Sequence, residues 1–380
     1  MNFSKKIVLI GNSSWYFYNF RLPLLIDIRK NGFNLFLVAP KDEYTEILKK
    51  YGFKIYEWEL NRKSINILRE LKSIMSLAKI LRIIQPDLIH NFTIKPCIYG
   101  TFISKINKTK IVFNAITGLG HVFISKSINK KILRFFLIPI YKIIFNLKKN
   151  IMIFQNESDK LIFHNLGILK NSTTFVIPGS GVDIELFNSK NVKKIKFEDP
   201  LKILFPARLI REKGIIELLI AFKSLLNEGL NINLILAGNI DKGNKSSLKI
   251  KEIKELKKIK NLKTLGHVNN MRELYDECDI VILPSWREGL SKTLIEAGAM
   301  SKPVITTNVP GCKDIIDHGV NGILVPVNDP KSIELAIKFY VENKNLSLKF
   351  GRNLRKKIER FYDHKKINKQ TIDKYKLYIN

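Results

Sequence analysis

Short runs of apolar residues alternate along the chain with longer segments in which apolar residues recur at helical spacing. The runs are rich in Ile, Leu and Val and predict buried strands. In the first half they lie at 6–11, 34–40, 87–92 and 110–116. Helical spacing is found at 19–32 and 64–85. Strands that alternate with helices predict a parallel sheet covered by helices on both faces.

The same alternation starts again after residue 200. The predicted strands of the second half lie at 201–208, 232–239, 279–285 and 303–308. The predicted helices lie at 215–229, 271–278 and 291–301. Between the halves, the segment 177–200 contains glycines and then becomes polar and charged. The chain is therefore predicted to be an α/β protein with two doubly wound, Rossmann-like domains in tandem.

A length of 380 residues is about right for two domains of ordinary size. We predict an N-terminal Rossmann-like domain over 1–182, a linker over 183–200 and a C-terminal Rossmann-like domain over 201–355. The remaining segment, 356–380, is predicted to be helical and to pack back on the N-terminal domain.

Basic residues are in large excess, with 65 Lys and Arg against 34 Asp and Glu and a formal net charge of +31. This indicates an anionic partner, although a chain rich in Ile, Lys and Asn is also what biased base composition produces. The distribution is more informative than the total, because no Asp or Glu occurs from Leu88 to Asn156. We interpret this acid-free stretch as facing an anionic surface.

Within that stretch, the segment 125–150 combines Ile, Leu and Phe with basic residues. Pro139 is expected to kink or divide it. A basic amphipathic helix of this kind lies in a membrane interface, and the alternative is an ordinary sheet-covering helix with solvated lysines. The residues expected to contact the anionic membrane are Lys126, Lys130, Lys131 and Arg134.

Two further features bear on the cellular compartment. No uncharged apolar run reaches the ~18 residues of a transmembrane helix, and the apolar run near the N-terminus fits a first strand better than a signal peptide. The three cysteines, Cys97, Cys278 and Cys312, form no CxxC pair. They indicate neither a disulfide framework nor a zinc site, so we expect a reducing compartment.

Two acidic residues stand at the start of a predicted helix in the stretch REGLSKTLIEAGAM, residues 287–300. Glu288 precedes the helix, and Glu296 lies about two turns inside it. Gly289 permits close backbone approach, and the N–H groups that follow it form an anion site suited to phosphate. Because carboxylates accept hydrogen bonds from sugar hydroxyls, this layout predicts a nucleotide-sugar site. The alternative is a helix with an incidental acidic first turn.

This stretch, after a strand that ends in Pro-Ser, resembles the EX7E signature of retaining GT-B glycosyltransferases of family 4. Six other stretches match that family in order and spacing: 84–92, 114–120, 177–187, 206–222, 236–239 and 302–326. The stretch LGHVNNMRELYDECDIVILPSWREG, 265–289, also fits. The resemblance covers the whole chain and implies the GT-B arrangement of two domains that face each other across a cleft. More narrowly, YNFRLPLL, HNFTIKP and NAITGLG resemble bacterial transferases that add N-acetylhexosamines to undecaprenyl-diphosphate-linked sugars.

The resemblance implies roles for residues of the second domain. Glu288 would hold hydroxyls of the donor sugar, and Glu296 those of the ribose. Arg208 and Lys213 would bind the diphosphate, and as fixed cations they would replace a metal ion. No convincing acidic metal motif is present, so we expect neither a metal nor a cofactor. The other expected donor contacts are Gly289, Leu290 and Ser291 through backbone amides, and Asn270 and Met271 around the base.

Candidate residues of the first domain are fewer. His121, in GLGHVF, is a candidate to polarise a group or accept a proton near the reacting carbon, or else a structural loop residue. Asn12 and Arg21 follow the first predicted strand and are candidate acceptor or phosphate contacts. Many relatives have a glycine-rich loop there, whereas this chain has only Gly11. His90 ends a buried strand at the cleft edge and either has a function or only packs.

Together these observations predict a cytoplasmic, retaining hexosyltransferase, bound peripherally to the inner face of the cell membrane. It would move an N-acetylhexosamine from a UDP-sugar to a polyprenyl-diphosphate-linked saccharide. The acceptor hydroxyl would attack on the face of the leaving group and lose its proton to a phosphate oxygen, so no carboxylate nucleophile is needed. One alternative is a UDP-sugar 2-epimerase on the same fold, for which the acid-poor first domain offers no obvious acid or base. The other is a nucleic-acid-binding protein, but no recognised module is present, and we expect no nucleic-acid partner.

Overall fold

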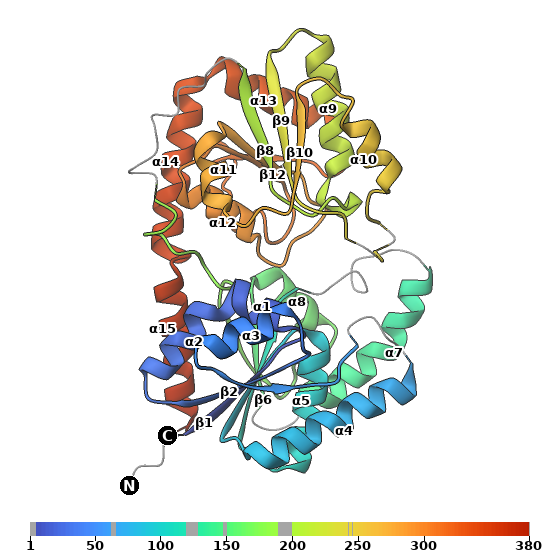
Figure 1. Ribbon diagram of the computed structural model, residues 1–380, viewed down its shortest axis with the longest axis vertical. Coiled ribbons are helices and arrows are strands. Elements are labelled where there is room, and N and C mark those ends of the chain that lie inside the picture. The colour runs from blue at the N-terminus through green and yellow to red at the C-terminus, as the bar shows by residue number, and fades with distance from the viewer. Residues whose placement is uncertain are drawn as a thin grey trace. The chain divides into compact units, whose positions relative to one another are not determined.

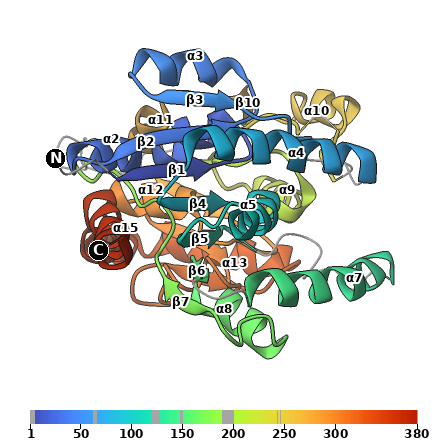
Figure 2. The same ribbon diagram turned by 90° about the horizontal axis from the view of Figure 1, so that it is seen from below.

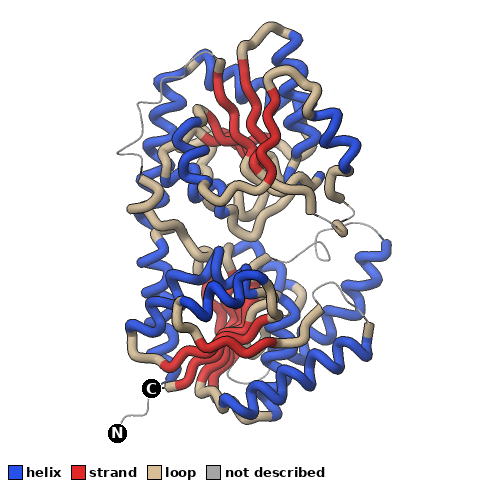
Figure 3. Tube along the Cα trace, viewed as in Figure 1, coloured by secondary structure: helices blue, strands red, loops and turns tan. Residues whose placement is uncertain are grey.

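The computed structural model describes residues 5–61, 66–118, 128–146, 150–188, 200–241, 243–244 and 246–379. For residues 128–133 and 136 the description covers the backbone alone. The chain divides into two compact units. Unit 1 comprises Met1–Ser180 with Lys365–Asn380, and unit 2 comprises Gly181–His364. Each unit is a parallel sheet with helices on both faces, so the predicted α/β class with two doubly wound domains is confirmed (Figure 1, Figure 3).

The strands described in unit 1 form one sheet in the order β3-β2-β1-β4-β5-β6-β7. Figure 2 shows this order from β3 at one edge of the sheet to β7 at the other. All of the pairings between neighbours in this order are parallel. The strands are β1 (Lys6–Ile10), β2 (Asn34–Ala39), β3 (Lys54–Glu57), β4 (Leu88–Phe92), β5 (Ile111–Ile116), β6 (Asn150–Phe154) and β7 (Thr173–Val176). The order reverses between β1 and β4, and ligands in open α/β sheets bind at such a point, beyond the carboxyl ends of the strands.

Alternate side chains of β1 enter two different cores of unit 1, because successive residues of a strand point to opposite faces. Ile7 and Leu9 pack with the first group of helices, whereas Val8 and Ile10 pack with the second. The first group is α1 (Ser14–Tyr16), the π-helical turn η1 (Phe17–Arg21), α2 (Leu22–Lys30), α3 (Glu43–Lys50) and α15 (His364–Ile379). The second is α4 (Ile67–Ile84) and α5 (Ile94–Ile106). A further core on the α5 side is formed with α7 (Ile128–Phe145) and α8 (Glu157–Asn165).

The C-terminal helix α15 belongs to unit 1 although it is the last element of the chain (Figure 2). Ile367, Ile372 and Tyr375 are buried in the same core as β1. The Asn368 side chain donates a hydrogen bond to the Asp27 carboxylate of α2 at 2.8 Å. Apolar burial therefore supplies most of the attachment of α15, and the polar contact fixes its position along α2.

Unit 2 has a second parallel sheet, in the order β10-β9-β8-β11-β12-β13. Its strands are β8 (Leu201–Phe205), β9 (Ile232–Ala237), β10 (Leu262–Gly266), β11 (Ile280–Leu283), β12 (Val304–Thr307) and β13 (Ile323–Val325). Its helices are η3 (Arg211–Lys213), α9 (Ile215–Asn227), α10 (Ile250–Leu256), α11 (Met271–Glu277), α12 (Lys292–Ala299), α13 (Pro330–Glu342) and α14 (Lys344–Phe361). Here the strand order reverses between β8 and β11, which form a parallel pair.

Two local features differ from the sequence expectation. The predicted helix 19–32 starts earlier, as α1 at Ser14, and passes through the π-helical turn η1 before α2 begins. Pro139 was expected to kink or divide its segment, but division is wrong, because α7 continues through it from Ile128 to Phe145. Loss of one backbone hydrogen bond is compensated there by burial of Tyr141, Ile144 and Phe145.

Candidate functional site

Two loops of unit 2 meet at the reversal point between β8 and β11. The loop after β8 carries Arg208 and leads into η3, which ends at Lys213. The loop after β11 carries Glu288. The two loops are joined by a hydrogen bond from the Trp286 N–H to the Glu212 carbonyl at 2.9 Å. The parallel sheet therefore brings together residues that are far apart in the sequence.

Lys213 and Glu288 form an ion pair between these loops. The Lys213 side chain is 20% exposed and that of Glu288 12% exposed. The same carboxylate oxygen accepts a hydrogen bond from the Ser285 hydroxyl at 2.7 Å. Cys312 lies close by, and burial, with the Glu288 charge, raises the pKa of its thiol to about 12. The thiol is therefore neutral, and Lys213 is the cation that balances Glu288.

Two glycines allow the backbone to reach this arrangement. Gly214 has φ of +74° and its hydrogen faces the Pro284 carbonyl, where a Cβ would lie 2.0 Å from the oxygen. Gly311 has φ of +78°, and a Cβ there would lie 2.6 Å from the Glu288 carbonyl oxygen. Because any side chain would collide with these backbone atoms, glycine at both positions lets the loops that carry Lys213 and Glu288 lie this close to their neighbours.

Glu296 lies on α12 and is bound by Tyr275 of α11. The Tyr275 hydroxyl donates to Glu296 Oε2 at 3.1 Å, and Lys292 Nζ is 3.6 Å from Oε1. Burial raises the pKa of Glu296, and the nearby Lys292 charge partly offsets the effect. The carboxylate retains acceptor capacity beyond these two contacts, which suits paired hydroxyl groups of a ligand.

The start of α12 is fixed by three contacts. The Ser291 hydroxyl accepts from the Leu294 N–H at 3.4 Å, and the Thr293 hydroxyl donates to the Pro206 carbonyl at 3.0 Å. The Ser291 N–H donates to the Gly311 carbonyl at 3.3 Å. Of the three amides expected to bind phosphate, that of Ser291 is therefore already engaged within the protein, while Gly289 and Leu290 lie in the loop just before it.

Arg208 lies at the edge of the same arrangement. Its guanidinium Nη1 is 2.6 Å from Asp241 Oδ2, and its side chain is 59% exposed. An exposed ion pair of this kind is weak, typically ~0.2–1 kcal/mol, so the side chain can exchange Asp241 for an anionic ligand at little cost.

Asn270 and Met271 lie at the start of α11, the helix that also carries Tyr275. The Asn270 side chain donates to Glu273 at 2.6 Å. The structure thus places these two candidate base contacts on the element that supports Glu296.

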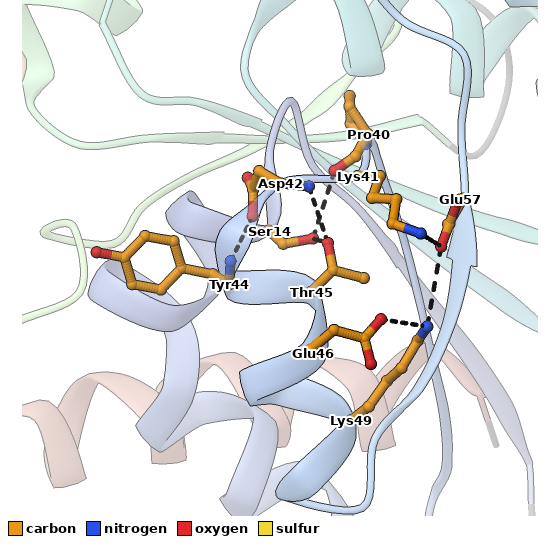
Figure 4. Close-up of polar contacts among 9 residues, drawn as sticks. All are labelled: Ser14, Pro40, Lys41, Asp42, Tyr44, Thr45, Glu46, Lys49 and Glu57. Carbon is orange, nitrogen blue, oxygen red and sulfur yellow. Dashed lines mark hydrogen bonds and ion pairs between the residues drawn. The ribbon is translucent and has the colours of Figure 1, made fainter.

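The candidates in unit 1 follow β1. Asn12 lines a cavity of about 360 Å³ together with Ser13, Pro40, Lys41, Asp42, Leu60 and Asn61. Hydrogen bonds next to its lining residues join the segment after β1 to the segment after β2, as Figure 4 shows. Ser14 and Thr45 hydroxyls are 2.9 Å apart, and Asp42 accepts from the Tyr44 N–H at 2.9 Å. Lys41 lies 3.4 Å from Glu57 of β3. A cavity of this size is in the range of small-molecule sites.

Arg21 and His90 are both buried and lie near each other on neighbouring elements. Arg21 ends η1, and His90 lies in β4. Both line a second, much smaller cavity at the carboxyl end of the unit 1 sheet.

The remaining candidates can be placed only in part. His121 and Lys126 lie outside the described residues. Lys130 and Lys131 belong to the part of α7 for which only the backbone is described. Arg134, further along α7, is half-buried. Phe135 and Ile143 of α7 are 74% and 69% exposed.

Three further properties of the described residues bear on metal binding, membrane insertion and thiol chemistry. No group of three or more His, Cys, Asp or Glu side chains within those ranges is placed to hold a metal ion. None of the helices in the described part of the chain combines the length and apolar character needed to cross a membrane. Cys97, Cys278 and Cys312 are buried free thiols.

Sequence reasoning missed two residues that position the candidate site. Ser285 donates to Glu288, and Tyr275 donates to Glu296. Ser285 was visible as the end of the strand before Glu288, but nothing in the pattern indicated where its hydroxyl points. Tyr275 lies in the predicted helix 271–278, and nothing in the pattern indicated that its hydroxyl reaches Glu296.

Comparisons with known families match both units. Residues 187–357 match the family described as "Glycosyl transferases group 1", and residues 6–156 match "Glycosyl transferase 4-like". Solved structures with the same fold include HepE from Anabaena, crystallised with UDP and glucose, at a TM-score of 0.79 and 19% identity over 98% of this chain and 99% of that one. Sucrose-phosphate synthase from Thermosynechococcus elongatus has a TM-score of 0.79 and 17% identity, over 98% of each chain.

Curated relatives are similar over nearly the whole length. The N,N'-diacetylbacillosaminyl-diphospho-undecaprenol alpha-1,3-N-acetylgalactosaminyltransferase of Campylobacter jejuni is 26% identical over 357 residues, 92% of each chain. The UDP-Gal:alpha-D-GlcNAc-diphosphoundecaprenol alpha-1,3-galactosyltransferase of Escherichia coli is 25% identical, over 84% of this chain and 81% of its own. With a family match in each of its two parallel-sheet units, this chain belongs to the group 1, GT4-like glycosyltransferases and has the GT-B fold.

Proposed function

We propose that this glycosyltransferase moves an N-acetylhexosamine from a UDP-sugar to a polyprenyl-diphosphate-linked saccharide, with retention at the anomeric carbon and without a metal ion. The step belongs to the assembly of a bacterial surface polysaccharide or glycan. The observation that carries the proposal is the Lys213–Glu288 ion pair at the reversal point of the unit 2 sheet, with Glu296 on the helix that follows.

The donor would be held by charges that suit its parts. Lys213 and Arg208 supply positive charge for the diphosphate, and Glu288 and Glu296 supply acceptors for sugar and ribose hydroxyls. Glu288 is oriented by Lys213 and Ser285, whereas Glu296 is oriented by Tyr275. Because these side chains are oriented before the ligand arrives, little binding energy is lost in ordering them.

Departure of the nucleoside diphosphate develops negative charge on its terminal phosphate. Lys213 and Arg208 would stabilise that charge electrostatically, the role that a metal ion has in other transferases. The acceptor hydroxyl attacks the anomeric carbon from the same face, a new glycosidic bond forms as the bond to the diphosphate breaks, and the hydroxyl proton moves to a phosphate oxygen. Glu288 binds hydroxyls of the donor in this scheme and is not a nucleophile.

The acceptor assignment rests on the relatives from Campylobacter and Escherichia, whose names specify undecaprenyl-diphosphate-linked acceptors. Two observations on this chain support it. The stretch from Leu88 to Asn156 has no Asp or Glu, so its basic residues give this part of the chain a net positive charge that suits an anionic, lipid-linked substrate. On α7, Phe135 and Ile143 are exposed beside the exposed Lys142, a combination that suits an anionic membrane interface. We propose that the protein acts at the inner, cytoplasmic face of the cell membrane.

The proposal is tested by incubating the purified protein with UDP-GlcNAc, UDP-GalNAc, UDP-Glc and UDP-Gal, each with and without polyprenyl-diphosphate-linked saccharides. Mass spectrometry of the lipid fraction should show the addition of one N-acetylhexosamine, and NMR of the product should show the anomeric configuration of the donor. Conversion of the UDP-sugar without an acceptor would instead identify an epimerase. Transfer only to acceptors without a diphosphate would contradict the proposed acceptor class.

A further inference from the structure

Arg21 is a buried cation without a carboxylate partner among the described residues. It is 7% exposed. Its Nε donates to the Tyr16 hydroxyl at 2.9 Å, and its Nη1 donates to the Gly179 carbonyl at 2.9 Å. The guanidinium lies 4.7 Å from the centre of the Phe92 ring. Neutral oxygens and an aromatic ring compensate the loss of hydration only in part, so an anion beside Arg21 would be strongly favoured.

His90 points a second unpaired group into the same region. It is 2% exposed, its Nδ1 is hydrogen-bonded to the Tyr375 hydroxyl of α15, and its Nε2 has no protein partner within the described residues. Burial, and secondarily the charge of Arg21, hold the pKa of His90 well below its ordinary value, so the ring is neutral. The Tyr375 hydroxyl has no other acceptor in the described part of the chain and therefore donates to Nδ1. The single ring hydrogen is then on Nε2, which is a donor.

Both groups line one cavity of about 10 Å³. Gln155, just after β6, is a third polar lining residue, half-buried and with no hydrogen bond to the described protein. A volume of about 10–15 Å³ accommodates one water-sized atom, so the cavity admits one ligand oxygen but no sugar ring. Arginine, a histidine N–H and a carboxamide together offer donors to that oxygen.

The place of the cavity in the fold is that of a ligand site. Arg21 follows β1, and His90 lies in β4, the two strands between which the order of the unit 1 sheet reverses. Arg21 is carried there by the π-helical turn η1, and such turns are frequent at functional sites. Thr371 of the C-terminal helix α15 also lines the cavity, and Tyr375 of the same helix is hydrogen-bonded to His90.

We propose that this cavity binds one phosphoryl oxygen of the diphosphate group in the lipid-linked acceptor, with Arg21, His90 and Gln155 as donors. The identity of the acceptor rests on the proposed function, whereas the oxyanion class rests on these three side chains. Arg21 supplies the charge, and His90 and Gln155 fix the position of the oxygen. The diphosphate of the donor is the other possible source of the same chemistry, and the test separates the two.

The test measures the affinity of the whole protein for geranyl diphosphate and, separately, for UDP, by isothermal titration calorimetry. Arg21→Gln should weaken geranyl diphosphate binding by about tenfold or more, because a hydrogen bond to a charged group contributes about 1.5–3 kcal/mol. UDP affinity should not change. The matched control is Arg29→Gln on α2, because Arg29 also stacks on a phenylalanine, Phe53, and donates to backbone carbonyls. This control should change neither affinity.

If Arg21→Gln does not fold, His90→Phe and Gln155→Leu replace it, since both leave Arg21 and its contacts in place. Each should weaken geranyl diphosphate binding by about threefold or more, the effect of one neutral hydrogen bond. Unchanged geranyl diphosphate affinity in these variants would overturn the inference. A loss of UDP affinity equal to the loss for geranyl diphosphate would assign the cavity to the donor and would also overturn it.

This binding assay does not depend on turnover, so it separates the inference from the proposed function. Diphosphate binding that requires Arg21, without any sugar transfer, would contradict the proposed function alone. If the protein transfers sugar to lipid-linked acceptors but Arg21→Gln leaves geranyl diphosphate affinity unchanged, only the cavity assignment would be contradicted.

Discussion

The ammonium group of Lys213 is paired with the carboxylate of Glu288, and this contact joins the loop after β8 to the loop after β11. The two residues are far apart in the sequence, and each is the oppositely charged partner of the other in a partly buried site. A ligand that is anionic at one end and rich in hydroxyls at the other would find the complementary group for each end in this one pair.

Replacing Glu288 and replacing Glu296 by alanine should impair different steps, the transfer reaction in the first variant and UDP binding in the second. We expect Glu288→Ala to lower kcat and kcat/KM together while UDP affinity is largely kept, because its contact is to the sugar that reacts. Glu296→Ala should weaken UDP binding itself. The measurements are steady-state kinetics and UDP titration, with Glu255→Ala as an exposed control. Wild-type kinetics in both variants would refute the assignment.

Removing the positive charge of Lys213 or of Arg208 should strongly lower the rate of transfer. Lys213→Ala and Arg208→Ala are expected to lower kcat by roughly 10²-fold or more, the usual cost of losing one preorganised electrostatic contact. Lys223→Ala, an exposed lysine on α9, is the matched control and should leave kcat unchanged. Only small losses in the first two variants would show that the leaving group is stabilised elsewhere.

Activity should persist in EDTA. The reason is that Lys213 and Arg208 supply fixed positive charge for the diphosphate. The measurement is the initial rate after exhaustive chelation, compared with the rate after Mg²⁺ or Mn²⁺ is restored. Strict dependence on either ion would show that this account of the chemistry is wrong.

Burial of the Glu296 carboxylate is expected to lower the stability of the folded protein at neutral pH, although the same carboxylate is proposed to bind the donor. Its pKa in the folded protein is raised above the ordinary value of 4.5, so the neutral acid stabilises the fold below pH 4.5, and this contribution is lost as the pH rises through the folded pKa. Glu296→Gln should therefore raise Tm at pH 7 by a few degrees, and the difference from wild type should shrink toward pH 4.5. Thermal scans across this range provide the measurement. A Tm at or below wild type at pH 7 would show that the contacts of Glu296 with Tyr275 and Lys292 outweigh the cost of burial.

Helix α7 should carry binding to anionic membranes. Vesicles that contain phosphatidylglycerol should bind the protein, and binding should weaken with salt. Changing Lys130, Lys131 and Arg134 together to Glu should reduce this binding at least about 100-fold, since each basic residue near such a surface contributes about 1 kcal/mol, and should leave UDP affinity intact.

The control for the membrane experiment is an equal change of charge in unit 2. The triple variant with Lys254, Lys257 and Lys258 changed to Glu alters three exposed lysines in and just after α10. It should bind vesicles as wild type does. Equal binding by wild type and the α7 variant would place the membrane face elsewhere.

Most of the architecture could be predicted from the sequence. Continuous apolar runs such as 6–11 and 279–285 are short, as is typical of strands buried on both faces, and the helical patterns between the runs indicate parallel connections. What escaped prediction was local. The π-helical turn that ends at Arg21 and the unbroken helix through Pro139 depend on packing against neighbours, which overrides local preference.

The sequence alone determined which chemistry this protein has available. The spacing of Glu288 and Glu296 around a helix start, and the cations at 208 and 213, are fixed by covalent order and by the 3.6-residue period of a helix. Only the tertiary structure decided which of these groups meet. Lys213 reaches Glu288 because β8 and β11 are neighbours in the sheet, and Tyr275 reaches Glu296 because α11 packs beside α12. Likewise, His90 presents a donor N–H to the cavity that Arg21 also lines only because α15 returns Tyr375 to the unit 1 core. Contacts between distant segments follow from strand order and burial, which no short stretch of sequence encodes.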